Sequence, residues 1–263
     1  MSKLEDAGLN RNASILSIAS HEPIFCLESE SILDCINKIL ETKHRRIPIV
    51  NRRKELVGIV TITDILDAIV RKEPLKEKIS EIMVRDVIFC FDTETIGEVL
   101  LKFKLSRRGG FPIVDKKRRL EGIVSERDIV WRFDRVNFGI KVKEAMSKKP
   151  IVIPPSLSIL DCLRTIVNVR YRRLPVVLDN ELVGIVTSVD LLRYLKKNEF
   201  KEDSLDEELE LVYQKEVYTI DPEVDLSLAI KKMKEKDVGG LLVVEGKELI
   251  GIITERDILE RIE

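Results

Sequence analysis

The hydrophobic positions of this chain repeat one short pattern of strands and helices. In its first copy, the apolar run Ile24–Leu27 lies between polar residues, which predicts a strand. Apolar residues at helical spacing follow from Ile32 to Leu40, and Ser31 is placed to cap that helix. The rest of the copy is predicted as strands at 47–50 and 57–61 and a closing helix at about 63–70. The unit is therefore strand-helix-strand-strand-helix.

The same plan recurs three more times. Helices are predicted at 96–103, 159–167 and 226–233, and second strands at 111–114, 174–177 and 241–244. Every copy contains Gly-hydrophobic-hydrophobic-Thr/Ser-x-x-Asp where its third strand meets the closing helix, and the four glycines lie 64, 62 and 67 residues apart. So regular a period indicates a duplicated unit. One unit is too small to bury its own sheet, so the units must pair.

The copies alternate in character. Copies one and three share Ser-Ile-Leu-Asp-Cys and an Arg-Arg pair before the second strand, whereas copies two and four share Glu-Arg-Asp-Ile and a Gly-Gly pair. This order predicts that a two-repeat module was duplicated whole. The predicted divisions are an N-terminal extension at 1–13, a first pair at 14–135 (repeats about 14–72 and 78–135) and a second pair at 136–263 (repeats about 141–197 and 210–263).

Composition narrows the class of protein. The 45 basic and 46 acidic residues leave a net charge of −1, which gives no general attraction to nucleic acid or membrane lipid. Charged residues reach 35%, which is typical of thermophile proteins rich in ion pairs. No apolar segment has the length of a signal peptide or a membrane span, so we expect a cytoplasmic protein. The four cysteines form no Cys-x-x-Cys pair and are expected to be buried hydrophobes.

Two interpretations of Thr/Ser-x-x-Asp stay open. The pattern fits a capping box, in which the hydroxyl and the carboxylate satisfy free amides at the start of a helix. It also places two polar groups at a helix N-terminus, which favours anions. The two roles can coexist. His21 and His44 have no neighbours suited to a metal site, and no metal is expected.

With these residues in hand, the chain resembles the CBS domain family, and four motifs in phase carry the resemblance over nearly its whole length. It is similar in organisation to the gamma subunits of AMP-activated protein kinases. The resemblance implies a mixed α+β fold, with four tandem CBS repeats paired into two Bateman modules that stack as a flat disc. It also implies clefts for adenosine derivatives, with AMP, ADP or ATP as the first expectation and S-adenosylmethionine or a related adenosyl compound as another.

The resemblance also implies roles for individual residues. The ribose would be bound by Asp64, Asp128, Asp190 and Asp257, and the phosphate or ribose hydroxyls by Thr61, Ser125, Thr187 and Thr254. Phosphate would be bound by Arg46 and Arg173, which match the family's arginine, and by Arg45 and Arg172, which stand where the family has histidine. From charge placement alone, Arg127 and Arg256 are added as phosphate ligands.

Four functions are compared. The favoured function is a regulatory sensor whose adenosyl ligand changes module packing and the affinity for a protein partner. The alternative is a ligand-independent scaffold for interaction or oligomerisation, with a homodimer as one outcome. Nucleic-acid binding through Lys116–Arg119 has less support, because the chain as a whole is neutral. An enzyme is disfavoured, since no Walker A run, Gly-x-Gly-x-x-Gly, His-Glu-x-x-His or nucleophile elbow occurs.

Overall fold

The computed structural model describes residues 3–42 and 44–262 and divides into two compact units. One comprises Ile24–Val87 and Ile151–Val217 and contains the body of the first and third repeats; we call it the odd unit. The other comprises Met1–Pro23, Ile88–Pro150 and Tyr218–Glu263 and contains the body of the second and fourth repeats; we call it the even unit. Each unit has its own hydrophobic core.

The odd unit contains two strand-helix-strand-strand-helix bodies. The first consists of β1 (Cys26–Leu27), α2 (Ile32–Thr42), β2 (Arg46–Val50), β3 (Leu56–Thr61) and α3 (Ile62–Val70), followed by the 3-10 turn η2 (Ile79–Glu81). The second consists of α7 (Ile159–Val169), β8 (Arg173–Leu178), β9 (Glu181–Thr187) and α8 (Ser188–Lys197), followed by η4 (Glu202–Leu205) and η5 (Leu209–Leu211). A parallel bridge from Ile153 to Val176 takes the place of β1 in the second body.

The even unit repeats the plan. Its N-terminal segment and first body comprise α1 (Lys3–Asp6), η1 (Ile15–Ser17), β4 (Cys90–Phe91), α4 (Ile96–Ser106), β5 (Gly110–Val114), β6 (Leu120–Ser125), α5 (Glu126–Val130) and η3 (Trp131–Phe133). Its second body comprises β10 (Thr219–Ile220), α9 (Leu226–Glu235), β11 (Gly240–Glu245), β12 (Glu248–Thr254) and α10 (Glu255–Leu259), preceded by α6 (Val142–Ala145) and β7 (Ser147–Lys148).

The sheets share an antiparallel hairpin; the third repeat has this hairpin alone, β8–β9, and the fourth adds β7 beside β12. In the first repeat β1 runs parallel to β2, and β2 forms an antiparallel hairpin with β3. Strand β3 alternates buried and half-buried residues, as expected of a strand with one face on the core. Strand β2 is buried from Ile47 onward, because its neighbours cover both edges. The mixed α+β prediction and the four repeats are confirmed.

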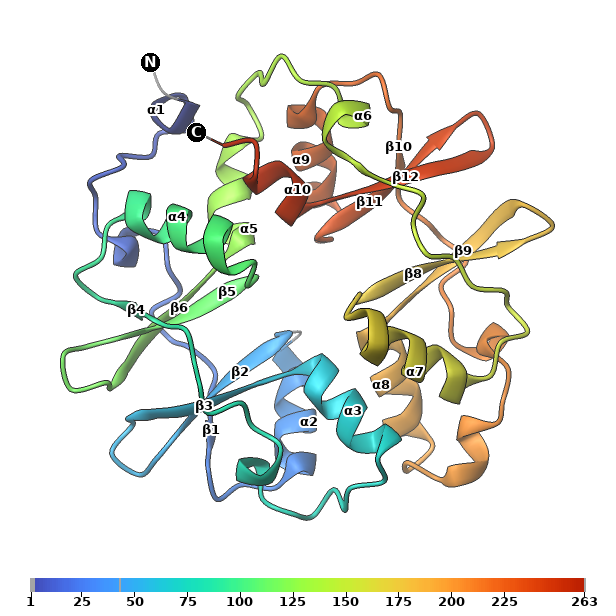
Figure 1. Cartoon of the computed structure of the whole chain (residues 1–263), viewed down its shortest axis with the longest axis horizontal. Helices are drawn as coiled ribbons and strands as arrows, with labels where there is room; N and C mark the ends of the chain where they lie inside the picture. The colour runs from blue at the N-terminus through green and yellow to red at the C-terminus, as the bar shows by residue number, and fades with distance from the viewer. Residues whose placement is uncertain (1–2, 43, 263) are drawn as a thin grey trace. The chain divides into compact units, whose positions relative to one another are not determined.

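Helices from two repeats share the core of each unit. In the odd unit α3 packs beside α7, and α2 packs against α8 (Figure 1). The apolar side chains that meet there include Ile62, Leu66, Ile159, Leu163 and Leu191, all almost completely buried. Burying a side chain of this size contributes about 2 kcal/mol. Packing between repeats thus supplies the burial that a single repeat lacks.

The motif glycines lie under the segments that lead into the repeats. A Cβ on Gly58 would lie 2.4 Å from Sδ of Met83, and one on Gly184 would lie 2.2 Å from the ring of Tyr213. The matching contact of Gly122 is the backbone oxygen of Ser20 at 2.8 Å, and that of Gly251 is Met146 at 2.5 Å. A side chain at Gly122 would require the backbone of Ser20 to shift, whereas one at Gly58 would require the Met83 side chain to move.

The lead-in segments are exchanged between repeats. Val84, which follows the lead-in of the second repeat, bridges to Ile59 of the first, and Ser20, which lies before the first strand of the first repeat, bridges to Ile123 of the second. Likewise β7 pairs with β12, and Gln214 bridges to Ile185. The predicted pairs at 14–135 and 136–263, and their stacking as a disc, stay predictions.

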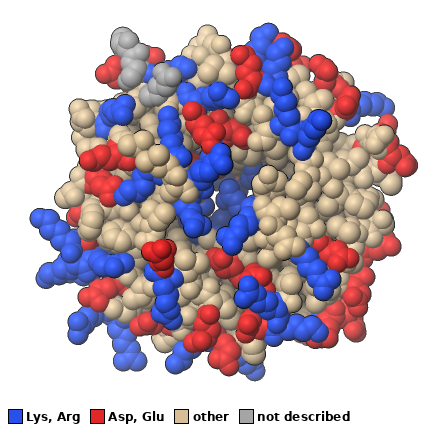
Figure 2. All heavy atoms as spheres, viewed as in Figure 1, with Lys and Arg blue, Asp and Glu red and all other residues tan. Residues whose placement is uncertain are grey.

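The predicted elements are close to those found. The helices extend two or three residues beyond four of the predicted ends, and the first strand is shorter, Cys26–Leu27 rather than 24–27. All four cysteines are completely buried, as predicted. Acidic and basic side chains are interspersed over the face drawn in Figure 2, in keeping with the net charge of −1. Over the described residues, no helix is long and apolar enough to cross a membrane.

Candidate functional site

The junction of β3 and α3 builds the first candidate site from Thr61 and Asp64. The Thr61 backbone N–H and hydroxyl each donate to Oδ2 of Asp64, both at 2.7 Å. The Asp64 amide donates back to Oγ1 of Thr61 at 3.4 Å. The extended Thr61 backbone ends the strand, and its side chain starts the helix. The pair is thereby held rigid at a helix N-terminus.

All four junctions form this capping box. The hydroxyl-to-Oδ2 distances are 2.7, 2.7, 2.6 and 2.5 Å for Thr61–Asp64, Ser125–Asp128, Thr187–Asp190 and Thr254–Asp257. The capping interpretation is confirmed for every copy. Binding of a ribose or phosphate by the same eight residues is not tested by these contacts and stays a prediction.

The cap uses Oδ2 of each aspartate and leaves Oδ1 for a second contact. Oδ1 of Asp257 accepts from the Ser147 hydroxyl at 3.0 Å, and Oδ1 of Asp190 accepts from the Gln214 amide at 3.3 Å. For Asp64 and Asp128, no described residue donates a hydrogen bond to Oδ1. An acceptor held in place with an open lone pair suits a ligand hydroxyl.

The carboxyl group of Asp128 has a raised pKa. Burial raises the pKa of Asp128 above its ordinary value, and the negative charge of Glu255 adds to the rise. Hydrogen bonds from Ser125 and the charge of Arg127 act in the opposite direction. The carboxylate of the second repeat is therefore a less readily ionised acceptor than an exposed aspartate.

In the odd unit, arginines stand directly opposite the caps. Arg46 pairs with Thr61 across the β2–β3 ladder, and Arg173 pairs with Thr187 across β8–β9. Residues opposite each other in an antiparallel pair project to the same face. The carbonyl oxygens of the preceding residues, Arg45 and Arg172, accept the first amide of the closing helix at 3.0 Å in both repeats. The structure thus brings together the predicted arginines, hydroxyls and carboxylates of copies one and three.

In the even unit, glycines hold the same positions. Gly110 pairs with Ser125 and Gly240 with Thr254, while the carbonyls of Gly109 and Gly239 accept the helix amides at 3.3 Å. These copies therefore present no arginine side chain from the second strand beside the cap.

The arginines of the even unit take part in crossed ion pairs. Nε of Arg127 in α5 lies 2.9 Å from Glu255 in α10, and Arg256 in α10 donates to Glu126 in α5. Both glutamates are buried, at 5% and 3% exposure. The crossed ion pairs form because each of these helices begins with the dipeptide Glu-Arg and because α5 packs against α10. Sequence reasoning missed these pairs.

Arg127 makes two further contacts. Its Nη1 lies 2.8 Å from Asp237, and its guanidinium lies 4.2 Å from the centroid of the Trp131 ring. A phosphate at Arg127 or Arg256 would compete with these carboxylates. Their predicted role as phosphate ligands stays a prediction, and the structure gives both a role in joining two helices.

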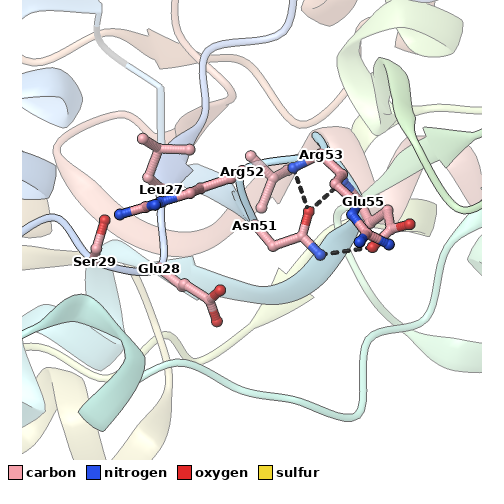
Figure 3. A pocket seen from close by; sticks show the side chains of 8 residues that line it. Leu27, Glu28, Ser29, Asn51, Arg52, Arg53 and Glu55 are labelled. Atoms are coloured by element: carbon pink, nitrogen blue, oxygen red, sulfur yellow. Dashed lines mark hydrogen bonds between the residues drawn. The ribbon is translucent and has the colours of Figure 1, made fainter.

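A separate pocket of about 260 Å³ lies at the far end of the first sheet (Figure 3). It is lined by Leu27, Glu28, Ser29, Val50, Asn51, Arg52, Arg53 and Glu55. Arg52 extends toward Ser29, and Asn51 closes the hairpin by accepting from Arg53 N at 2.8 Å and donating to Glu55 at 2.6 Å. Strand β3 runs from this pocket to Thr61, so about 17 Å separates the pocket from the cap. The only signal in the sequence was the basic hairpin 51–54.

The described residues contain no group of three or more His, Cys, Asp or Glu side chains that could hold a metal ion. His21 and His44 are both exposed. The polar chemistry of the molecule is therefore concentrated at the caps, the crossed ion pairs and the hairpins.

Comparison with known proteins agrees with this architecture. The family model described as CBS domain matches residues 15–71, 79–134, 142–197 and 209–263. An uncharacterized 33.4 kDa protein from Thermofilum pendens, found in a ribosomal RNA operon, is 29% identical over 95% of this chain and 91% of its own length. Protein MJ1225 of Methanocaldococcus jannaschii is 29% identical over 94% of this chain and 98% of its own.

Solved structures share the fold. The crystal structure of MJ1225, described as a proposed archaeal homolog of g-AMPK, superposes with a TM-score of 0.87 at 28% identity and covers 94% of this chain and 99% of that one. A conserved protein from Pyrococcus horikoshii superposes with a TM-score of 0.66 at 20% identity, covering 95% of this chain and 100% of that one. At 20% identity, the likeness to the Pyrococcus horikoshii protein shows a shared fold only.

Proposed function

Because the chain belongs to the CBS domain family, with four repeats, we propose that it is a regulatory sensor that binds an adenine nucleotide at the caps of its first and third repeats. AMP, ADP or ATP is the proposed ligand, and S-adenosylmethionine is the second choice. The likeness to MJ1225, itself described as a proposed homolog of g-AMPK, supports this class of function.

The observation that carries the proposal is the register of Arg46 on Thr61 and of Arg173 on Thr187. A guanidinium beside a rigid hydroxyl and a helix N-terminus suits a phosphate, because charge-assisted hydrogen bonds and the helix dipole act in the same direction. Oδ1 of Asp64 suits a ribose hydroxyl, whereas at Asp190 a ribose hydroxyl would have to share or replace the hydrogen bond from Gln214 to Oδ1. Copies two and four offer the carboxylate and hydroxyl without the strand arginine, so we expect weaker or differently selective binding there.

Regulation follows from packing between repeats. The caps begin α3 and α8, whose apolar faces are part of the core shared by the first and third repeats. A ligand that binds one arrangement of these helices better than another shifts the population toward it and changes the affinity for a partner. In this proposal the chain is cytoplasmic and has no catalytic residue, and the regulated activity belongs to a protein partner or to the chain's own homodimer.

A thermal-shift panel of AMP, ADP, ATP, NADH and S-adenosylmethionine tests the proposal. A ligand at 100 times its Kd stabilises the folded state by about 2.7 kcal/mol and raises the melting temperature. Asp64→Asn with Asp190→Asn should remove the rise, because the amide NH2 of asparagine replaces the Oδ1 acceptor. The amide oxygen can still accept the hydrogen bonds of the cap, so the helix start is retained. The matched control, Asp128→Asn with Asp257→Asn, should keep most of the ligand-induced rise in melting temperature. No rise with any of the five ligands contradicts the sensor.

A scaffold without ligand is the second candidate. All four capping boxes close within the chain itself, so the fold needs no ligand to begin its closing helices. If the nucleotide panel has no effect and light scattering finds a stable oligomer, the scaffold is favoured. A gel shift with DNA that disappears with added salt would instead favour nucleic-acid binding.

A further inference from the structure

The pocket at the hairpin of the first repeat lies wholly within the odd unit and apart from the caps. Its volume of about 260 Å³ is just below that of pockets for drug-sized ligands, so it suits a small metabolite. Leu27 and Val50, which pair where β1 and β2 end, supply its apolar part. The remaining lining residues are polar or charged.

Both walls of the pocket are held in place by their own side chains. In the loop after β1, Glu30 accepts a hydrogen bond from the N–H of Leu27 at 2.6 Å and pairs with Lys38 at 2.8 Å. In the hairpin, the Asn51 side chain accepts from the N–H of Arg53 at 2.8 Å. The pocket is therefore formed before a ligand arrives, which lowers the entropic cost of binding.

Two opposite charges and a hydroxyl line this pocket without partners. The side chains of Arg52, Glu28 and Ser29 make no hydrogen bond or ion pair with any other residue that the structure describes. Figure 3 shows Arg52 extending toward Ser29, with the Glu28 carboxylate apart from both. A guanidinium donates two parallel hydrogen bonds to a carboxylate, and a glutamate accepts from an ammonium. The complementary ligand carries both charges at once and has a small apolar group.

We propose that the pocket binds a free α-amino acid with an aliphatic side chain. The carboxylate of the amino acid accepts hydrogen bonds from Arg52 and from the Ser29 hydroxyl. Its ammonium group donates to Glu28, and its side chain contacts Leu27. This site is separate from the caps and takes a second class of ligand, so it does not depend on the proposed nucleotide sites.

The second repeat has a similar hairpin with different groups. Lys116 stands where Arg52 does, and Asp92 stands where Glu28 does. A lysine offers a point charge that does not match both oxygens of a carboxylate. Oδ1 of Asp92 is buried, with no hydrogen-bond partner among the described residues, so it is closed to a ligand in solvent. We therefore expect the amino acid at the first repeat, and Lys116 provides a matched control.

Calorimetric titration of the full chain with leucine tests the proposal. Leucine should bind at one site per chain. N-acetylleucine lacks the ammonium group and leucinamide lacks the carboxylate, so each should bind about tenfold more weakly or worse, because a charge-assisted hydrogen bond is lost. Inorganic phosphate, a simple anion, should not compete with leucine.

Variants locate the binding. Arg52→Gln and Glu28→Gln each remove one charge while keeping a side chain of similar size, and each should weaken leucine binding about tenfold or more. Lys116→Gln makes the same kind of change in the second hairpin and should bind leucine as the parent does. Circular dichroism should find all three folded, because the side chains of Arg52, Glu28 and Lys116 lie at the surface or half-buried and hold no printed contact of the core.

Three results would overturn the proposal. One is that leucine gives no heat of binding with the parent. Another is that N-acetylleucine or phosphate binds as tightly as leucine, which would make the pocket an anion site. The third is that Arg52→Gln and Glu28→Gln bind leucine as the parent does. Arg52→Gln should still bind AMP as the parent does, so the amino-acid site and the nucleotide sites can fail separately.

Discussion

The odd and even units share a backbone plan but use their charges differently. In the odd unit, arginines stand on the strand opposite each cap, and the helix starts are apolar or small, with Ile62 and Ser188 buried. In the even unit, glycines replace those arginines, and the helix starts carry the crossed pairs of Arg127 with Glu255 and Arg256 with Glu126. The odd unit places arginines on the strand opposite its caps, and the even unit pairs the arginines at its helix starts with buried glutamates.

The comparison teaches that the shared motif sets the position of a site, while two variable positions set its chemistry. The Thr/Ser-x-x-Asp cap is the same in all four repeats. The units differ at two positions: the second strand begins with Arg46 or Arg173 in the odd unit and with glycine in the even unit, and the closing helix begins with Ile62 or Ser188 in the odd unit and with Glu126 or Glu255 in the even unit.

The largest expected effect comes from breaking one crossed pair. Glu255→Leu should lower the free energy of unfolding by about 3 kcal/mol, since it leaves the partly buried Arg127 without its buried carboxylate. Urea denaturation followed by the fluorescence of Trp131, the single tryptophan, measures it. Glu202→Leu, which removes the exposed partner of Lys72, should cost less than about 1 kcal/mol. Equal losses in the two variants would show that the crossed pairs add no more than surface charges.

Replacing the helix-start residues of the even unit by those of the odd unit tests the same ion pairs. Glu126→Ile, Arg127→Thr, Glu255→Ser and Arg256→Val together give the even unit the residues found in the first and third repeats. Because both charges of each pair leave together, stability should fall by less than in Glu255→Leu alone. A fall larger than that of the single variant would mean that the ion pairs stabilise this fold beyond what an apolar junction can supply.

The motif glycines should also differ between the units. Gly122→Ala should cost about 2 kcal/mol, because the new Cβ would meet the backbone oxygen of Ser20 at 2.8 Å. Gly58→Ala should cost about 1 kcal/mol, because the side chain of Met83 can move away. Urea midpoints of the two variants measure the difference. The reverse order would contradict the packing described for the lead-in segments.

Sequence reasoning predicted what is local. The four repeats, most element positions, the buried cysteines and the capping boxes follow from periodicity and from contacts within three residues. The crossed ion pairs could not be predicted, because Arg127 and Glu255 are 128 residues apart and only the packing of α5 on α10 joins them. The exchange of lead-ins was missed for a similar reason, since Met83 belongs to the lead-in of the second repeat yet lies on Gly58 of the first.

The smallest expected effect concerns pH. Because the pKa of folded Asp128 is raised, the folded state holds a proton that the unfolded chain has already released. Asp128 therefore makes stability fall as pH rises from the unfolded pKa through the raised folded pKa. Asp128→Asn should remove this fall, so its stability relative to the parent should increase with pH over that range. Urea midpoints at a series of acidic pH values check this; a constant difference would contradict it.

Calorimetric titration with AMP tests the central claim most directly, that the adenosyl sites lie at the caps beside Arg46 and Arg173. The account predicts binding to the parent, with most of the heat lost in Asp64→Asn with Asp190→Asn and kept in Asp128→Asn with Asp257→Asn. Circular dichroism should find both variants folded, because an amide oxygen still caps each helix. Loss of binding in the second pair with retention in the first, or equal loss in both, would contradict the account.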